Sequence, residues 1–311
     1  MLVVENLVKK YGKFKAVDGL SLEIGEGHIY GFVGANGAGK TTTMKIIAGL
    51  LKPTEGRVTV DGADITRDPK GVKRKIGYMP DFFGVYDDLK VTEYMDFYSG
   101  VYGIAKSERE KIADQLLELV NLSDKKDAYV DTLSRGMKQR LCLARSLIHN
   151  PQLMILDEPA SGLDPRARVE MKEILKGLKD MGKTILISSH ILPELAELCT
   201  SIGIIEHGKM VISGTVEEIM KKVSHRKTLR VKVLGDMDPT VRFLQEQPLT
   251  GGISIASDYI DVDFEGDDEA LAGILKSLVN NGIPIISFTE LEKNLESVFM
   301  HLTVGGVDNA N

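Results

Sequence analysis

The residues best suited to chemistry lie in one glycine-rich segment, Gly34-Ala35-Asn36-Gly37-Ala38-Gly39-Lys40-Thr41. Its spacing fits the phosphate-loop pattern G-x-x-x-x-G-K-[ST] at every fixed position. Glycines let the backbone approach phosphate oxygens closely, and a helix N-terminus points free N–H groups at them. We therefore expect Lys40 to reach the β- and γ-phosphates of a nucleoside triphosphate, and the hydroxyl of Thr41 to bind Mg²⁺.

The elements on either side of this segment decide between a phosphate loop and a chance match. Residues 29–33 form a short apolar run typical of a buried strand, and residues 42–51 have helical spacing with apolar positions for packing. A phosphate loop requires a strand before it and a helix after it. This context favours a phosphate loop over the alternative, a glycine-rich turn with an exposed lysine.

A second candidate for chemistry is the pair Asp157-Glu158, which ends the charge-free run 153–156. Two carboxylates at the end of a buried strand are costly unless they meet a cation or a polar site. In open α/β sheets this end of a strand is where ligands bind. We expect Asp157 to support Mg²⁺ and Glu158 to polarise a water for attack on the γ-phosphorus. Solvated turn acids are the alternative, which the phosphate loop disfavours.

Three further polar positions begin or end predicted elements. The ring of Tyr11 could stack on a purine, although strand propensity alone favours a half-buried tyrosine at a strand end. Ser134 is suited to cap a basic amphipathic helix, which is either an anion-binding helix end or only a capped helix. His190 ends the buried strand 184–190 and could donate a hydrogen bond to the γ-phosphate, although a lone histidine there is more often structural.

The overall composition bounds the class of protein. A chain of 311 residues suffices for about two domains, and its 43% hydrophobic and 27% charged content is that of an ordinary globular protein. The net charge of -6 gives no electrostatic support for nucleic-acid binding. With two distant cysteines we expect no disulfide framework. Because no apolar run approaches a membrane span and the N-terminus does not resemble a signal peptide, we expect a cytosolic protein.

The order of the predicted elements indicates an α/β fold with two domains. Antiparallel strands open the chain, and the later alternation of strands and helices implies a largely parallel sheet. A helical insert is expected at about 83–150, since residues 90–122 have amphipathic helical spacing. A basic, polar stretch at 221–227 is typical of a linker. We expect a nucleotide-binding domain at 1–220 and an accessory domain at 221–311.

The accessory domain and the insert have weaker links to chemistry. The predicted order βαββαβ, plus a last helix at 291–302, suggests a small ferredoxin-like α+β unit without a catalytic constellation. In the insert, aromatic residues either pack a small core or form a contact surface for a partner. These residues are Tyr94, Phe97, Tyr98 and Tyr102.

Taken together, these segments resemble the ATP-binding cassette (ABC) ATPases across residues 1–220, in the motif order of that family. The matching segments are the phosphate loop GANGAGKTT, the signature-like LSRGMKQR, LMILDEP, SGLD and SSH. The resemblance implies a P-loop NTPase mixed sheet with an antiparallel β subdomain and a helical subdomain. It also implies that Glu158 is the catalytic base, that Lys40 and His190 contact the γ-phosphate, and that Tyr11 stacks on adenine.

The resemblance further implies the remaining ligands of ATP and Mg²⁺. In this family two nucleotide domains dimerise head to tail, so Ser134 and Gly136 would cap ATP bound to the other copy, with Asp164 linking the two sites. Phosphate contacts are expected from Gly34, Asn36, Gly37, Ala38, Gly39, Lys40, Thr41 and Thr42. Metal contacts are expected from Thr41, Asp81 and Asp157.

Two positions depart from the family pattern. The usual signature LSGGQ has Arg135 in place of its first glycine and Met137 in place of its glutamine. If that first position needed a positive φ, arginine would cost about 1–2 kcal/mol there. A loop that usually carries glutamine has Asp81 instead, so its carboxylate would keep the metal-side contact.

We therefore expect a Mg²⁺-dependent ATPase that homodimerises around two ATP molecules and powers a separate membrane permease, with export as the expected direction. The segment 229–302 is similar to the extension of bacterial and archaeal export ATPases. Such a subunit would be cytoplasmic and peripheral at the inner face of the membrane. The alternatives are a soluble cassette ATPase of translation or DNA repair, and a regulatory module that binds ATP without hydrolysing it.

Overall fold

The structure is a computed structural model that describes residues 1–82, 84, 88–191, 195–223 and 227–291. The chain divides between Val216 and Glu217 into two compact units. Within the described ranges, every helix is too short or too polar to cross a lipid bilayer.

The first unit is built on a six-stranded sheet with the order β10-β9-β3-β8-β7-β6. Neighbouring strands are parallel, except for the edge strand β10, which runs antiparallel to β9. The strands are β3 (Ile29–Val33), β6 (Ile76–Met79), β7 (Leu153–Asp157), β8 (Thr184–Ser189), β9 (Ser201–Glu206) and β10 (Lys209–Thr215). Strands β3, β7 and β8 are buried along their whole length, as expected where both faces of a parallel sheet are covered.

Helices and a second sheet cover the two faces of this central sheet. Helix α1 (Lys40–Ile47) and an antiparallel sheet, with the order β2-β1-β4-β5, share one hydrophobic core with residues of β3, β7 and β8. These outer strands are β1 (Leu2–Tyr11), β2 (Phe14–Ile24), β4 (Glu55–Val60) and β5 (Ala63–Asp64), followed by helix α2 (Pro69–Arg74). Helix α6 (Pro165–Asp180) lies on the other side, because Leu186 belongs to the shared core and the next residue, Ile187, faces α6. The predicted antiparallel entry sheet is confirmed.

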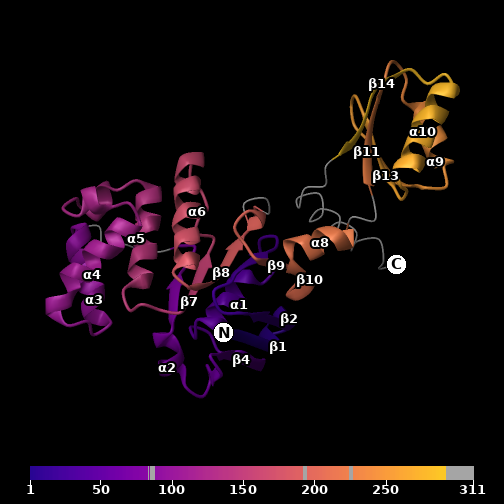
Figure 1. Ribbon diagram of the computed structural model, residues 1–311. Coiled ribbons are helices and arrows are strands. Elements are labelled where there is room, and N and C mark those ends of the chain that lie inside the picture. Colours follow the sequence, from indigo (N-terminus) through magenta and orange to yellow (C-terminus); the bar gives the residue numbers. More distant parts are fainter. Residues whose placement is uncertain (83, 85–87, 192–194, 224–226, 292–311) are drawn as a thin grey trace. The chain divides into compact units, whose positions relative to one another are not determined.

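Three helices of the insert pack against one another (Figure 1). They are α3 (Val91–Val101), α4 (Lys106–Leu119) and α5 (Arg135–Leu147), with short 3-10 turns at Ser123–Lys125 and Val130–Thr132. Tyr94 is fully buried and accepts a 3.0 Å hydrogen bond from the guanidinium of Arg145. Phe97 and Tyr102 remain 45% and 44% exposed. The predicted aromatic core therefore holds for Tyr94, while part of the cluster stays on the surface.

The second unit has a four-stranded antiparallel sheet with the order β12-β13-β11-β14. Its elements are α8 (Val216–Val223), β11 (Lys227–Val233), α9 (Asp238–Gln245), β12 (Thr250–Ile255), β13 (Ile260–Phe264), α10 (Asp268–Asn280) and β14 (Ile285–Leu291). Alternating residues of β11 and β13 build a separate hydrophobic core with α9 and α10. The order βαββαβ is as predicted. Residues 221–223 of the predicted linker lie in α8, and residues 292–302 of the predicted last helix lie outside the described residues.

Candidate active site

The phosphate loop joins the buried end of β3 to the start of α1, so the loop backbone is held at both ends. Gly39 has a φ of 108°, and a Cβ at this residue would lie 2.4 Å from the carbonyl oxygen of Ala16. A side chain therefore fits neither the backbone conformation nor the space at this position. The turn between β9 and β10 supports the loop from outside, because the N–H of Gly208 donates to the carbonyl of Ala38 at 2.9 Å.

A cavity of about 310 Å³ opens over this loop. It is lined by the loop itself, the start of α1, the β1–β2 turn and two acidic residues. These lining residues are Tyr11, Phe14, Ala16, Ala35, Asn36, Gly37, Gly39, Lys40, Thr41, Thr42, Asp81 and Glu158. The structure thus brings most of the sequence-predicted ligands to one space, although they come from segments far apart in the chain.

Lys40 and Glu158 meet inside this cavity. The Nζ atom of Lys40 donates to the carbonyl of Gly34 at 2.6 Å and lies 3.5 Å from Oε1 of Glu158. Both side chains are largely buried, at 6% and 12% exposure. A phosphate group that entered the loop would therefore compete with the Glu158 carboxylate for the same ammonium group.

His190 contacts the other oxygen of that carboxylate. Its Nδ1 lies 2.8 Å from Oε2 of Glu158, and about half of the imidazole is exposed. A neutral imidazole donates from one nitrogen only. If His190 donates to Glu158 through Nδ1, it can donate to a phosphate through Nε2 only as the imidazolium. The predicted contact of His190 with a γ-phosphate therefore depends on whether it keeps its bond to Glu158.

Asp157 lies behind Glu158, fully buried at the end of β7. Its Oδ1 accepts a 2.8 Å hydrogen bond from Oγ of Ser188, and its Oδ2 has no partner among the described residues. A buried carboxylate oxygen without a partner is costly unless a cation or water reaches it. Carboxylate and hydroxyl oxygens suit Mg²⁺, which binds few protein groups and keeps other positions for phosphate and water. Asp157 and the Thr41 hydroxyl thus fit this ion, and no larger cluster of metal ligands occurs among the described residues.

The other acidic residue of the cavity, Asp81, has a perturbed pKa. Burial raises the pKa of Asp81 above its ordinary value of 3.8, and the charges of Asp157 and Glu158 raise it further. The positive charge of Arg135 acts in the opposite direction. Burial also raises the pKa of the Tyr78 hydroxyl, and the negative charges of Asp157 and Asp81 raise it further. A cation in this acidic region would lower the pKa of Asp81.

The signature-like segment begins α5 as expected. Ser134 is the N-cap, and its Oγ accepts from the N–H of Met137 at 3.3 Å. Arg135 lies inside the helix and is not among the residues with positive φ, so the backbone cost considered for it does not arise. Asp164 is the N-cap of α6 and accepts from the N–H of Ala167 at 2.9 Å. Ser134, Gly136 and Asp164 do not line the cavity over the phosphate loop.

Two residues near this site escaped the sequence analysis. Phe14 pairs with Tyr11 across the β1–β2 turn, and both rings line the cavity at 62% and 51% exposure. A second aromatic residue directly after the turn at Gly12-Lys13 was the available signal in the sequence. Ser188 bonds Asp157, but nothing in the sequence spacing reveals which strand lies beside β7.

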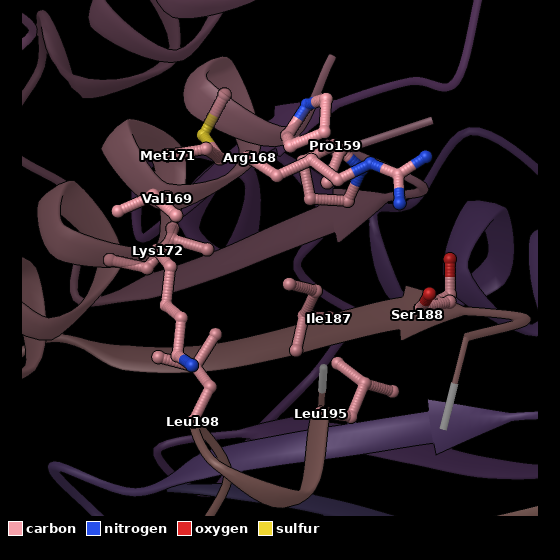
Figure 2. Close-up of a pocket in the computed structure, with 13 residues that line it drawn as sticks. Pro159, Arg168, Val169, Met171, Lys172, Ile187, Ser188, Leu195 and Leu198 are labelled. Carbon is pink, nitrogen blue, oxygen red and sulfur yellow. The ribbon is translucent and has the colours of Figure 1, made fainter. Parts of the chain in front are cut away.

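A second cavity, of about 260 Å³, lies between α6 and β8 (Figure 2). Figure 2 shows Val169 and Met171 of α6, Ile187 of β8 and the side chains of Leu195 and Leu198 around it. Because its lining is mostly apolar, this cavity is less suited to a triphosphate than the cavity over the phosphate loop.

The fold and this site define a P-loop nucleoside triphosphatase. A phosphate loop joins a buried parallel strand to a helix, and an acidic pair ends another strand of the same sheet. A family model described as "ABC transporter" matches residues 17–161.

Relatives match nearly the whole chain. The linearmycin resistance ATP-binding protein LnrL of Bacillus subtilis (strain 168) is 32% identical over 97% of this chain and 98% of its own length. The bacitracin transport ATP-binding protein BcrA of Bacillus licheniformis is 35% identical over 97% of this chain and 96% of its own. The Nod factor export ATP-binding protein I of Ralstonia nicotianae is 34% identical over 97% of this chain and 94% of its own length.

Solved structures agree with these relatives. The structure of an ATP-binding subunit of an ABC transporter matches with a TM-score of 0.65 and 29% identity, over 72% of this chain and 93% of that one. A dimeric structure of MJ0796, a bacterial ABC transporter cassette, matches with a TM-score of 0.63 and 27% identity, over 70% of this chain and 99% of that one. The chain belongs to the ABC transporter family, as an ATP-binding subunit with ATPase activity. The resemblance and fold class predicted from the motifs are confirmed, and the relatives favour transport over translation or DNA repair.

Proposed function

We propose that the cavity over the phosphate loop binds ATP together with Mg²⁺ and hydrolyses the γ-phosphate. The observation that carries this proposal is the meeting of Lys40, Glu158 and His190 beside a buried Asp157 at one edge of the sheet. Tyr11 and Phe14 line the same cavity and would hold the base. The first compact unit would then be the nucleotide-binding domain, and the second an accessory domain.

The chemistry follows from the charges in the site. Phosphoryl transfer needs mainly positioning and charge stabilisation, so Lys40 and the loop N–H groups would hold the phosphate oxygens. Thr41, Asp157 and Asp81 would hold Mg²⁺, which would neutralise charge on the phosphates when bound. As the phosphate takes over the contact with Lys40, Glu158 becomes free to orient water. Glu158 would thus change from the partner of Lys40 to the base.

We infer that hydrolysis takes place in a homodimer with two ATP molecules. Ser134, Gly136 and Asp164 belong to motifs that resemble nucleotide ligands, yet they lie outside the cavity of their own chain. A second copy in head-to-tail arrangement would bring its α5 N-terminus, with partial positive charge, to the phosphates. The solved structure of MJ0796, which is described as dimeric, supports the formation of a dimer.

We further propose that the dimer powers a separate membrane permease and acts in export, at the inner face of the membrane. Phe82 is 92% exposed directly after Asp81, and Val101 is 66% exposed on α3. Val101 lies one helical turn after Phe97, which is 45% exposed, and neighbouring exposed apolar side chains of this kind mark contacts with a partner protein. The names of the relatives, which include transport, resistance and export, support the direction.

The test is an ATPase assay with and without Mg²⁺, combined with sedimentation of the purified protein in the presence of a nonhydrolysable ATP analogue. We expect Mg²⁺-dependent phosphate release and a nucleotide-dependent dimer. Purification from detergent-solubilised membranes, with a tag on this chain, should recover a membrane protein. A chain that binds ATP but releases no phosphate would instead be the regulatory module considered above.

A further inference from the structure

We propose that Ser188 is a positioning residue for hydrolysis, because its hydroxyl fixes both acidic residues at the end of β7. This inference deepens the proposed function and rests on it. Ser188 is fully buried near the end of β8 and lies directly opposite Asp157 in the parallel pairing of β7 with β8. Figure 2 shows it at the end of β8, beside the cavity under α6.

The hydrogen bonds of Ser188 have a defined direction. The backbone N–H of Glu158 can only donate, and it donates to Oγ of Ser188 at 3.0 Å. The hydroxyl proton is therefore free for the carboxylate, and Oγ lies 2.8 Å from Oδ1 of Asp157. With Oδ1 occupied in this way, Oδ2 is the oxygen left without a partner among the described residues. Ser188 thus selects which oxygen of Asp157 is available to a cation.

The bond to Glu158 controls the second acidic residue. Glu158 has a φ of 52°, a left-handed conformation that residues other than glycine seldom adopt. This turn of the backbone leads the side chain to Lys40 and His190. Because Ser188 holds the N–H of Glu158, it stabilises the backbone at the residue where the chain leaves the strand.

His190, which contacts Glu158 through Nδ1, follows Ser188 by two residues in the chain. The metal-side carboxylate, the proposed base and the histidine are therefore held by one short segment of β8 and its neighbour β7. Hydrogen-bond partners of metal ligands commonly affect metal affinity or activity by about 10- to 100-fold. We expect an effect of this size for the hydroxyl of Ser188.

The experiment compares Ser188→Ala and Ser188→Cys with Ser189→Ala in the full chain. The thiol of cysteine fills a similar space but is a weak hydrogen-bond donor. Ser189 points to the opposite face of the sheet, where its Oγ accepts from the N–H of Ile191, so it is a matched control. The measurements are kcat and KM for ATP, the melting temperature, and Mn²⁺ binding by electron paramagnetic resonance with a nonhydrolysable ATP analogue.

We expect both Ser188 variants to lose kcat by about 10- to 100-fold and to bind Mn²⁺ about tenfold more weakly, with KM for ATP changed by less than about threefold. Ser189→Ala should match the wild type. Wild-type kcat or Mn²⁺ affinity in Ser188→Ala would overturn the proposal. If Ser188→Ala does not fold, Ser188→Cys decides, and full activity of that variant would also overturn it. A wild-type protein without Mg²⁺-dependent hydrolysis would instead refute the proposed function.

Discussion

Replacing Glu158 with glutamine removes a carboxylate that Lys40 contacts inside the phosphate cavity. The Nζ–Oε1 distance is 3.5 Å between two largely buried side chains. At an effective dielectric constant of about 20, this distance corresponds to about 5 kcal/mol of Coulombic attraction, before the desolvation that offsets much of it. An entering γ-phosphate must replace that attraction, and it also meets the negative charge of Glu158 itself.

Glu158→Gln should therefore bind ATP more tightly and hydrolyse it much more slowly. We expect about a tenfold gain in affinity if roughly 1.4 kcal/mol of the competing attraction is relieved, because each such step is a factor of ten. Loss of the proposed base should lower kcat by about 10²- to 10⁴-fold. The variant should consequently accumulate as an ATP-loaded dimer.

The assays are titration with a fluorescent ATP analogue, phosphate release and light scattering after size-exclusion chromatography. Glu173→Gln is a matched control, because it removes an exposed carboxylate from α6 that pairs with Lys176. Weaker ATP binding by Glu158→Gln would refute the idea that Glu158 competes with phosphate for Lys40. Wild-type turnover would remove Glu158 from the role of base.

Three further predictions concern the edges of the site. Tyr11→Ala and Phe14→Ala should each weaken nucleotide binding by about 1–3 kcal/mol if both rings stack on the base. Titration with ATP should show this loss of affinity, whereas titration with tripolyphosphate, which has no base, should show none. Burial and neighbouring carboxylates raise the pKa of Asp81, so its charge disfavours the folded state at neutral pH. Asp81→Asn should therefore melt higher than wild type at pH 7, and the difference should shrink as the pH falls through that raised pKa and the wild-type carboxyl takes up its proton. Gly162 has a φ of 67°, and the Arg135 guanidinium lies where a Cβ at this residue would be. Gly162→Ala should lower the free energy of unfolding by about 1–2 kcal/mol because alanine is strained in this conformation. Adding Arg135→Ala should not restore the stability, because the backbone conformation at residue 162 stays the same.

The sequence was sufficient wherever function depends on local order. The phosphate loop follows from glycine spacing between a strand and a helix, and the predicted N-cap Ser134 accepts a hydrogen bond from the first turn of α5. The acidic pair was visible because charge directly after a buried strand needs a cation or a polar partner. These features involve neighbours in the chain, whose geometry the backbone largely fixes.

The tertiary structure alone decided how distant residues combine. Spacing did not show that β8 lies beside β7, which places Ser188 opposite Asp157, or that Phe14 joins Tyr11 at the same cavity. It also left open the backbone of Arg135, which the structure places in a regular helix. Strand pairing and register arise from packing across the whole core, whereas residue spacing reports only the few positions around each residue. The sequence therefore determined which groups could act on a nucleotide, and the packed sheet determined which of them reach it together.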